Sequence, residues 1–311
     1  MTKFRHNISQ IFLHIITHCS LFIALSSLLF AQGGKTGLAF LKMGVGSRAL
    51  AMGEAYSALA SDPSAVHYNP AALSLSTTSQ ILLMHKEWIQ DTKTEFLAAK
   101  TSYEQFTFAL GINSTNVDNI EIRTTPGPSE GTFSSHNAAI GLSTAYLINS
   151  DLSIGITGNF LYEKIFVNEA SGLGVDVGAL YQTPWDVRLA FAINNIGSMN
   201  ELDMTSSKLP TTIRIGAAHQ RPIESVNGML SVSAEVTSVS EDAKPHVHLG
   251  AELELEHVFS IRAGYRSGYD ARNFSVGTGI RYGALQFGYA FVPIKFDLGT
   301  THTLSLGIEF P

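Results

Sequence analysis

The sequence has almost no cysteine and little charge. Cys19 is the only cysteine among 311 residues, and it lies in a segment that we expect to be removed, so a framework of disulfide bonds is excluded. Asp, Glu, Lys and Arg make up 15% of the chain, whereas soluble domains usually contain about 25%. The net charge is −6 and no basic stripe is evident, which argues against nucleic acid as a partner.

Long apolar runs are missing everywhere except near the N-terminus. Lys3 and Arg5 precede an apolar stretch over residues 11–30, and small residues follow it. This pattern predicts a secretory signal peptide over residues 1–31 that is cleaved near Ala31. An uncleaved membrane anchor is the alternative, but histidines interrupt the stretch and make it a poor permanent span. The rest of the chain holds no apolar run long enough for a transmembrane helix.

Instead of long apolar runs, the rest of the chain contains segments in which apolar and polar residues alternate. Successive side chains of a strand point to opposite faces, so such a segment has one apolar and one polar face. The last segment shows it best: Leu304, Leu306, Ile308 and Phe310 alternate with Thr303, Ser305, Gly307 and Glu309. About fourteen segments follow this pattern, which predicts that residues 77–311 form a 14-stranded antiparallel transmembrane β-barrel, an all-β fold. The first two segments, near residues 80–85 and 96–103, alternate poorly.

The connections between these segments alternate in length. We expect long loops over residues 113–136, 163–172 and 197–210, and tight turns between them, with residues 220–227 as an exception. Outer-membrane barrels have short periplasmic turns and longer outer loops. The pattern therefore predicts a location in the outer membrane of a Gram-negative type of cell, with lipid around the barrel.

Charged residues fall on the face opposite the apolar sets. An Arg or Lys that faces lipid at mid-depth costs roughly 2–4 kcal/mol, so we expect this face to line the lumen. The predicted lumen charges are Asp176, Arg188, Arg214, Glu235, Glu252, Arg262 and Arg281.

Residues 32–76 lack strand alternation and are predicted to form a hatch inside the barrel. Small residues are frequent there, and Asp62-Pro63 and Asn69-Pro70 can each start a helical turn. We single out Arg48, Asp62, Asn69 and Pro70 as hatch or gate residues. Arg48 and Asp62 are expected to pair with lumen charges, and Asn69 is expected to cap a turn. These residues would set a gate, or their caps and salt bridges would simply hold a plug in place.

The hatch segment carries a family resemblance. Residues 46–49, 52–53, 58–62 and 66–73 resemble the PorV/PorQ family of FadL-like outer-membrane barrels, and so do residues 172–181 and 262–265. The resemblance implies a 14-stranded barrel with an N-terminal hatch. It also implies a component of type IX protein secretion or of outer-membrane assembly, whose partners would be secreted cargo proteins or secretion-system subunits. The alternative is a FadL-like porter for long-chain fatty acids or other hydrophobic small molecules.

Signals for catalysis are weak. The nucleophile pattern G-x-S-x-G is absent, since residues 141–145 lack its last glycine, and we expect no enzyme activity and no cofactor. His246 and His248 share one strand face and could bind a metal with Glu252. We favour the alternative that both histidines face the lumen or its rim without a metal, because the sequence spacing brings no further ligand near them.

Overall fold

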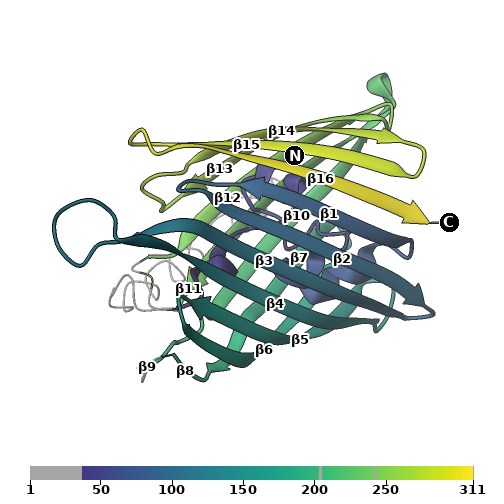
Figure 1. Ribbon diagram of the computed structural model, residues 1–311. Coiled ribbons are helices and arrows are strands. Elements are labelled where there is room, and N and C mark those ends of the chain that lie inside the picture. The colour runs from purple at the N-terminus through teal and green to yellow at the C-terminus, as the bar shows by residue number, and fades with distance from the viewer. Residues whose placement is uncertain (1–36, 203–204, 241, 243, 311) are drawn as a thin grey trace, which may run out of the picture.

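The computed structural model describes residues 37–202, 205–240, 242 and 244–310, and the predicted signal peptide lies outside them. Fourteen antiparallel strands form a closed barrel (Figure 1). Each barrel strand pairs with the preceding and the following strand of the barrel, and β1 closes the barrel by pairing with β16. The first seven barrel strands are β1 (Ser79–Glu87), β2 (Thr92–Tyr103), β3 (Phe106–Ile122), β4 (Gly131–Leu147), β5 (Leu152–Ile165), β6 (Asn168–Gln182) and β7 (Val187–Met199). The other seven are β10 (Thr212–Ile223), β11 (Gly228–Val239), β12 (His246–Leu255), β13 (Phe259–Ser267), β14 (Phe274–Tyr282), β15 (Leu285–Ile294) and β16 (Gly299–Phe310).

The outer face of the barrel is apolar, as the alternation predicts. In β7, Leu189 and Phe191 are exposed to the surroundings, while Ala190 and Ala192, which alternate with them, are buried. The same arrangement holds in the barrel strands from β3 to β16. A slip of one residue would turn each apolar set into the lumen, so the predicted register is confirmed there.

Strands β1 and β2 alternate poorly because both of their faces are apolar. Leu83 and Leu97 point outward. On the opposite face, Leu82, Met84 and Phe96 belong to a buried cluster with apolar residues of the N-terminal segment. This part of the wall therefore packs against protein on the inside and exposes apolar side chains on the outside.

The connections differ in length at the two ends of the barrel. We call the end that holds the β2–β3 and β14–β15 connections the turn end, and the opposite end the loop end. The predicted long loops are partly wrong: β3 and β4 pair out to residues 122 and 131 (seen as the projecting hairpin in Figure 1), and only residues 166–167 separate β5 from β6. The connection after β7 contains the small sheet of β8 (Glu201–Leu202) and β9 (Thr205–Ser206). At the turn end, residues 220–227 complete β10 and form η4 (Glu224–Val226).

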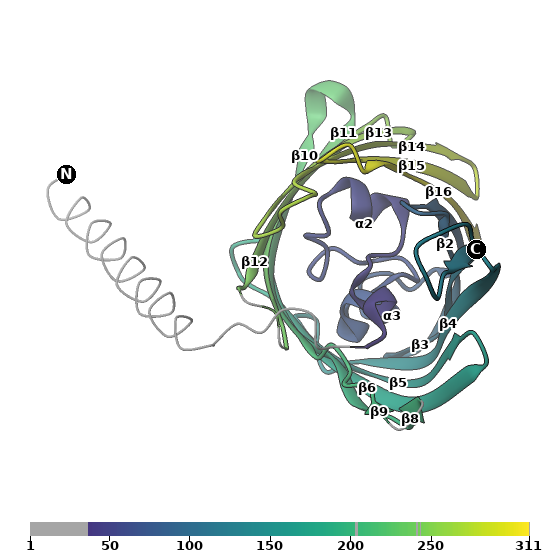
Figure 2. The ribbon, with the colours of Figure 1, turned by 60° about the vertical axis from the view of Figure 1, so that its left-hand side comes forward.

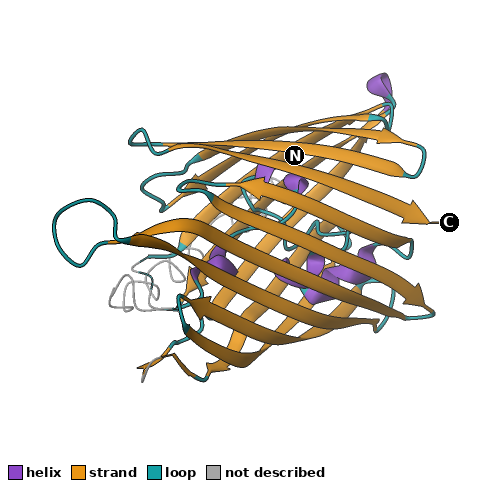
Figure 3. Cartoon of the chain, in the orientation of Figure 1, coloured by secondary structure: helices purple, strands orange, loops and turns teal. Residues whose placement is uncertain are grey.

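The N-terminal segment lies inside the barrel (Figure 2). Its elements are the short helices η2 (Ala39–Lys42), α2 (Ser47–Ala51), α3 (Ala65–Tyr68) and η3 (Pro70–Leu75), which stand out from the strands in Figure 3. We call residues 37–75 the hatch. Among the described residues, no helix is long and apolar enough to span a membrane.

The hatch runs through the lumen from one end to the other. At the loop end, the backbone N–H of Gly37 donates to the carbonyl of Lys208 at 3.1 Å, and Lys42 lies 3.5 Å from Asp242. At the turn end, β1 begins at Ser79, which pairs with Phe310. The chain thus crosses the whole barrel before its first strand starts.

Candidate functional site

The hatch is bound to the wall through carboxylates of the predicted lumen face. Glu252 of β12 accepts from two guanidinium groups: Nη2 of Arg48 lies 2.6 Å from Oε1, and Nε of Arg262 lies 2.5 Å from Oε2. The Arg48 side chain is 24% exposed and that of Glu252 only 3%. Arg48 therefore pairs with a lumen charge, as expected from the sequence, but it shares that carboxylate with a second cation from the wall.

Glu235 of β11 holds the middle of the hatch. Its Oε2 accepts from the backbone N–H groups of Tyr56 and Ser57 at 3.2 and 2.9 Å. Its Oε1 lies 2.9 Å from Nη1 of Arg214 on β10, and both side chains are almost fully buried. A charged acceptor for backbone donors is stronger than a neutral one, so this carboxylate fixes the hatch while its charge is balanced by Arg214.

A third buried pair was not found from the sequence. Glu54 of the hatch lies 2.5 Å from Nη1 of Arg266 on β13, with both side chains at most 4% exposed. Burial alone would raise the pKa of Glu54, but Arg266 and other nearby cations outweigh it and lower the pKa to about 2. Arg266 shares the lumen face with Arg262, so alternation could have identified it. Glu54 carries no comparable signal in the sequence.

Asp62 bonds within the hatch rather than to a lumen charge. Its carboxylate accepts from the hydroxyl of Tyr56 at 2.7 Å and from the backbone N–H of Ser64 at 2.8 Å. Nη1 of Arg48 lies 3.3 Å from the same Tyr56 hydroxyl. The structure thus brings Arg48 and Asp62 to one point, with Tyr56 between them.

Asn69 and Pro70 lie at the start of η3. The Oδ1 of Asn69 accepts from the N–H of Ala71 at 3.1 Å, and Pro70 occupies the first turn. The amide of Asn69 also donates to the carbonyl of Ala179 on β6 at 3.2 Å. Asn69 therefore caps the turn and joins it to the wall. A Cβ at Gly178 would overlap the Asn69 side chain, so the wall approaches the hatch closely here because this position has no side chain.

The remaining predicted lumen charges bond to the wall. Asp176 accepts from Nδ2 of Asn159 at 2.8 Å and from a backbone N–H at 2.6 Å. Arg188 donates to the side chains of two glutamines on neighbouring strands. Arg281 lies at the turn end, where its side chain is 44% exposed and pairs with Glu309 at 3.1 Å. These three charges do not contact the hatch in any hydrogen bond or ion pair of the described residues.

The predicted rim histidines occupy different surroundings. Nδ1 of His248 lies 2.7 Å from the carbonyl of Gly53, and Nε2 lies 3.0 Å from the hydroxyl of Thr237. His246 instead stacks on Tyr269, with ring centroids 4.0 Å apart. Glu252, which would be the third ligand of a metal site with the two histidines, instead forms ion pairs with Arg48 and Arg262. The arrangement makes His248 a contact between hatch and wall.

Polar cavities lie at both ends of the hatch. The loop-end vestibule has a volume of about 640 Å³ and is lined by residues of the hatch, β10 to β12 and the β13–β14 connection. The turn-end cavity, of about 310 Å³, lies beside Arg48, Glu252 and Arg281. The hatch lies between these two cavities.

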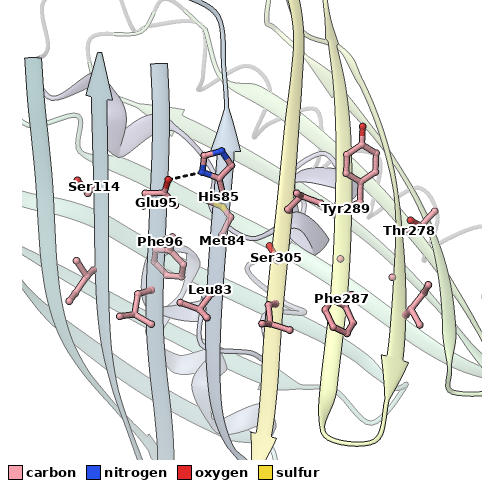
Figure 4. Close-up of a pocket in the computed structure, with 17 residues that line it drawn as sticks. Leu83, Met84, His85, Glu95, Phe96, Ser114, Thr278, Phe287, Tyr289 and Ser305 are labelled. Carbon is pink, nitrogen blue, oxygen red and sulfur yellow. Dashed lines mark hydrogen bonds and ion pairs between the residues drawn. The ribbon is translucent and has the colours of Figure 1, made fainter. Parts of the chain in front are cut away.

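An apolar groove of about 590 Å³ lies on the wall formed by β14 to β16 and β1 to β3 (Figure 4). Leu83, Leu97 and Phe287 are among its outward-facing side chains. His85 and Glu95 lie at one end of the groove, and Nδ1 of His85 is 2.6 Å from the carboxylate. Met84 and Ser305, which point inward, also reach the groove.

The fold is that of outer-membrane channels. The CymD monoaromatic hydrocarbon channel matches with a TM-score of 0.62 and 14% identity, covering 88% of this chain and 97% of that chain. The toluene transporter TodX of Pseudomonas putida matches at 0.57 and 12% identity, with 86% and 97% covered. A FadL homologue of Pseudomonas aeruginosa matches at 0.56 and 12% identity, with 86% and 98% covered.

Comparison of sequences gives a more limited result. The model of an uncharacterised protein family, UPF0164, matches residues 29–162. This region includes the hatch and the strands from β1 to most of β5. No curated protein matches the sequence.

Proposed function

We propose that the protein is a non-enzymatic outer-membrane channel for small hydrophobic molecules. The observation that carries this proposal is the position of its concave surfaces. The apolar groove lies on the outer wall, where the membrane would be, and the polar cavities lie at the two mouths of a lumen filled by the hatch. A hydrophobic solute gains free energy by entering the bilayer, whereas a polar solute needs a continuous aqueous path.

The hatch contacts the inner side of the wall that carries the groove. The backbone N–H of Ser47 donates to the hydroxyl of Ser305 at 2.9 Å, and that of Gly46 lies 3.0 Å from the sulfur of Met84. Both wall residues reach the groove. Movement of α2 would therefore free the inner side of this part of the wall, and we propose that solute passes here from the lumen towards the bilayer.

The likeness to CymD and TodX supports small aromatic hydrocarbons as the class of solute, because those channels are named for monoaromatic hydrocarbons and for toluene. Long-chain fatty acids are the other solutes implied by the family resemblance. A long acyl chain would bring more apolar surface than a single ring against the charges of Arg214, Glu235 and Glu252 that line the lumen, so its desolvation cost would be larger.

Uptake of radiolabelled toluene by intact Gram-negative cells that express the chain tests this proposal. Intact outer membranes are needed because small aromatics cross plain phospholipid bilayers unaided. We expect faster uptake than in cells without the protein. Leu306→Trp, which fills the groove, should reduce the uptake severalfold, and Leu189→Trp, on an outward position away from the groove, should not. Uptake equal to that of cells without the protein would contradict the proposal.

A role in protein secretion or outer-membrane assembly stays a prediction from the resemblance of residues 46–73. Its test is the identification of proteins that co-purify with the detergent-extracted barrel. Secretion-system subunits or cargo proteins in stoichiometric amounts would support it.

A further inference from the structure

The loop-end vestibule contains a guanidinium group without a carboxylate partner. Arg272 lies in the β13–β14 connection and lines the vestibule. Among the residues that the structure describes, no hydrogen bond or ion pair to its guanidinium is found, although most other arginines of the lumen are paired. An arginine that is held in place but unpaired is suited to bind an anionic group of a ligand.

Aromatic rings lie close to this guanidinium. Its Cζ lies 4.9 Å from the ring centroid of Tyr269 and 5.9 Å from that of Trp88, both within cation–π distance. The N–H groups at the edge of the guanidinium remain for hydrogen bonds. Planar, two-oxygen acceptors such as carboxylates match this edge.

The connection that carries Arg272 is anchored to the barrel. The Nδ2 of Asn273 donates to the carbonyls of Arg266 and Tyr269 at 3.0 and 3.4 Å. The N–H of Arg266 donates to the carbonyl of Asn273 at 2.6 Å. Arg272 therefore belongs to a positioned segment, and a ligand would not have to order it.

The vestibule offers further donors and an aromatic surface. Nε of Arg214 is buried and has no hydrogen-bond partner among the described residues, while the other end of its guanidinium binds Glu235. His246 adds an aromatic surface through its stacking on Tyr269, and its Nε2 lies 3.5 Å from Asp242. Buried donors without partners are rare in folded proteins and point to a missing acceptor.

Most of the other charged groups of the vestibule are paired, whereas Lys244, Asp270 and Arg272 line it without an ion pair among the described residues, and Glu54 attracts Arg272 only from a longer distance. Lys42 pairs with Asp242, and Glu54, which also lines the vestibule, pairs with Arg266. Arg214 pairs with Glu235. A volume of about 640 Å³ lies within the range of about 300–1,000 Å³ that is usual for small-molecule sites.

We propose that the loop-end vestibule binds a small aromatic carboxylate, with the carboxylate against the N–H edge of Arg272 and the ring beside the stacked side chains of Tyr269 and His246. This inference goes beyond the proposed function, which concerns neutral hydrophobic solutes, because it assigns a separate site for an anion to the loop end of the lumen. The neutral hydrocarbon of the same shape would lack the contact with Arg272.

Calorimetry with the full-length protein in detergent tests the site, with benzoate as the probe and benzamide as its uncharged counterpart. We expect benzoate to bind at least tenfold more tightly than benzamide at pH 7. Arg272→Gln should weaken benzoate binding at least tenfold, and Arg272→Lys, which keeps the charge but loses the planar edge, should have an intermediate effect. Arg281→Gln, which removes a guanidinium at the opposite mouth, is the matched control and should bind benzoate like the wild type.

Equal affinity for benzoate and benzamide, or unchanged benzoate binding in Arg272→Gln, would overturn the inference. Thermal melting of each variant shows that the barrel is folded, so a loss of binding is not a loss of structure. The toluene uptake assay separates this inference from the proposed function. Normal toluene uptake with no preference for benzoate rejects the carboxylate site alone, and benzoate binding without toluene uptake rejects the channel alone.

Discussion

At the scale of single residues, the hatch is held by three buried carboxylates that each face a guanidinium. Glu235 and Glu252 come from the wall, and Glu54 comes from the hatch. Alternation placed the wall residues on the lumen face because it reports which face a side chain is on. It contains no information about which hatch atom lies opposite, so the contacts of Glu235 with Tyr56 and Ser57 could not be predicted. Because two cations surround Glu252, removing Arg48 leaves Glu252 paired with Arg262.

We predict that Glu235→Gln loosens the hatch more than the loss of any other single wall carboxylate. The change leaves Arg214 buried without its partner, and breaking a buried pair costs about 3–5 kcal/mol. Cys19, the only cysteine, lies in the predicted signal peptide, so Ala58→Cys at a buried hatch position, combined with Cys19→Ser, provides a single reporter thiol. Its reaction with a maleimide should be at least about 100-fold faster in Glu235→Gln, since about 1.4 kcal/mol corresponds to a factor of ten.

Glu309→Gln is the control for this experiment, because Glu309 lies at the turn-end mouth and its side chain is 24% exposed. It should leave the labelling rate of the Ala58→Cys reporter near that of the parent. Equal labelling rates in Glu235→Gln and the parent would contradict the role of Glu235 in fixing the hatch.

His67 should make hatch binding weaken as the pH falls. Burial, together with Arg214 and Lys86, lowers the pKa of His67 to about 3, and its Nε2 has no hydrogen-bond partner among the described residues. In a released hatch this group would have its ordinary pKa of about 6.5. Between pH 6.5 and 3, the bound hatch therefore takes up fewer protons than the released hatch. As the pH decreases through this window, binding of the hatch to the wall is weakened by up to about 1.4 kcal/mol per pH unit.

Conductance of single channels in planar bilayers between pH 7 and pH 5 measures this effect. We expect more frequent opening at pH 5, and a flatter pH dependence in His67→Gln, which cannot be protonated in this range. Glu54 does not contribute between pH 7 and pH 5. Because its pKa is lowered in the bound hatch, the stabilisation that its carboxylate gives to hatch binding is lost only below about pH 4.5. An identical pH dependence in His67→Gln would exclude His67 as the titrating group.

At the scale of elements, the strands were predicted best where the two faces differ in polarity. From β3 to β16 the register follows from side chains such as Phe191 and Ile213, which face outward. In β1 and β2 the apolar hatch packs against the inner face, so the pattern that marks a strand disappears. Loops were overestimated between β3 and β4, because polar residues there continue the ladder beyond the apolar part of the wall, where alternation no longer marks the strand.

The close approach of η3 to the wall depends on a glycine, and we predict that Gly178→Leu displaces this element. A side chain there would overlap Asn69 and Pro70, whereas the strand pairing of β6 would be unaffected. The Ala58→Cys reporter should therefore react faster, while the unboiled protein still runs as a folded barrel on a gel. Gly158→Leu is the matched control, because a Cβ at Gly158 has open space around it. Similar labelling in both variants would mean that this contact does not hold the hatch.

At the scale of the whole molecule, a closed barrel is combined with a chain that crosses its lumen. Fourteen strands leave more interior space than their own side chains fill, since barrel diameter grows with strand number. The hatch occupies this space and leaves the loop-end vestibule and the turn-end cavity on either side of it. The barrel and an inner helical segment could be predicted from the sequence. The direction of the hatch could not, because it depends on contacts such as that of Gly37 with Lys208 between segments far apart in the chain.

Deletion of residues 37–75 should therefore convert the closed barrel into an open pore. β1 starts at the turn end, so no remaining segment would have to cross the lumen. We expect single-channel conductance in planar bilayers to rise on the order of tenfold or more, because the lumen would fill with water as it does in somewhat wider barrels. Deleting residues 124–129, in the connection between β3 and β4, is the control, since it shortens the chain outside the lumen. If both deletions left the conductance at the wild-type level, the hatch would not be the element that closes the barrel, and passage of solute would have to follow a route that does not involve its movement.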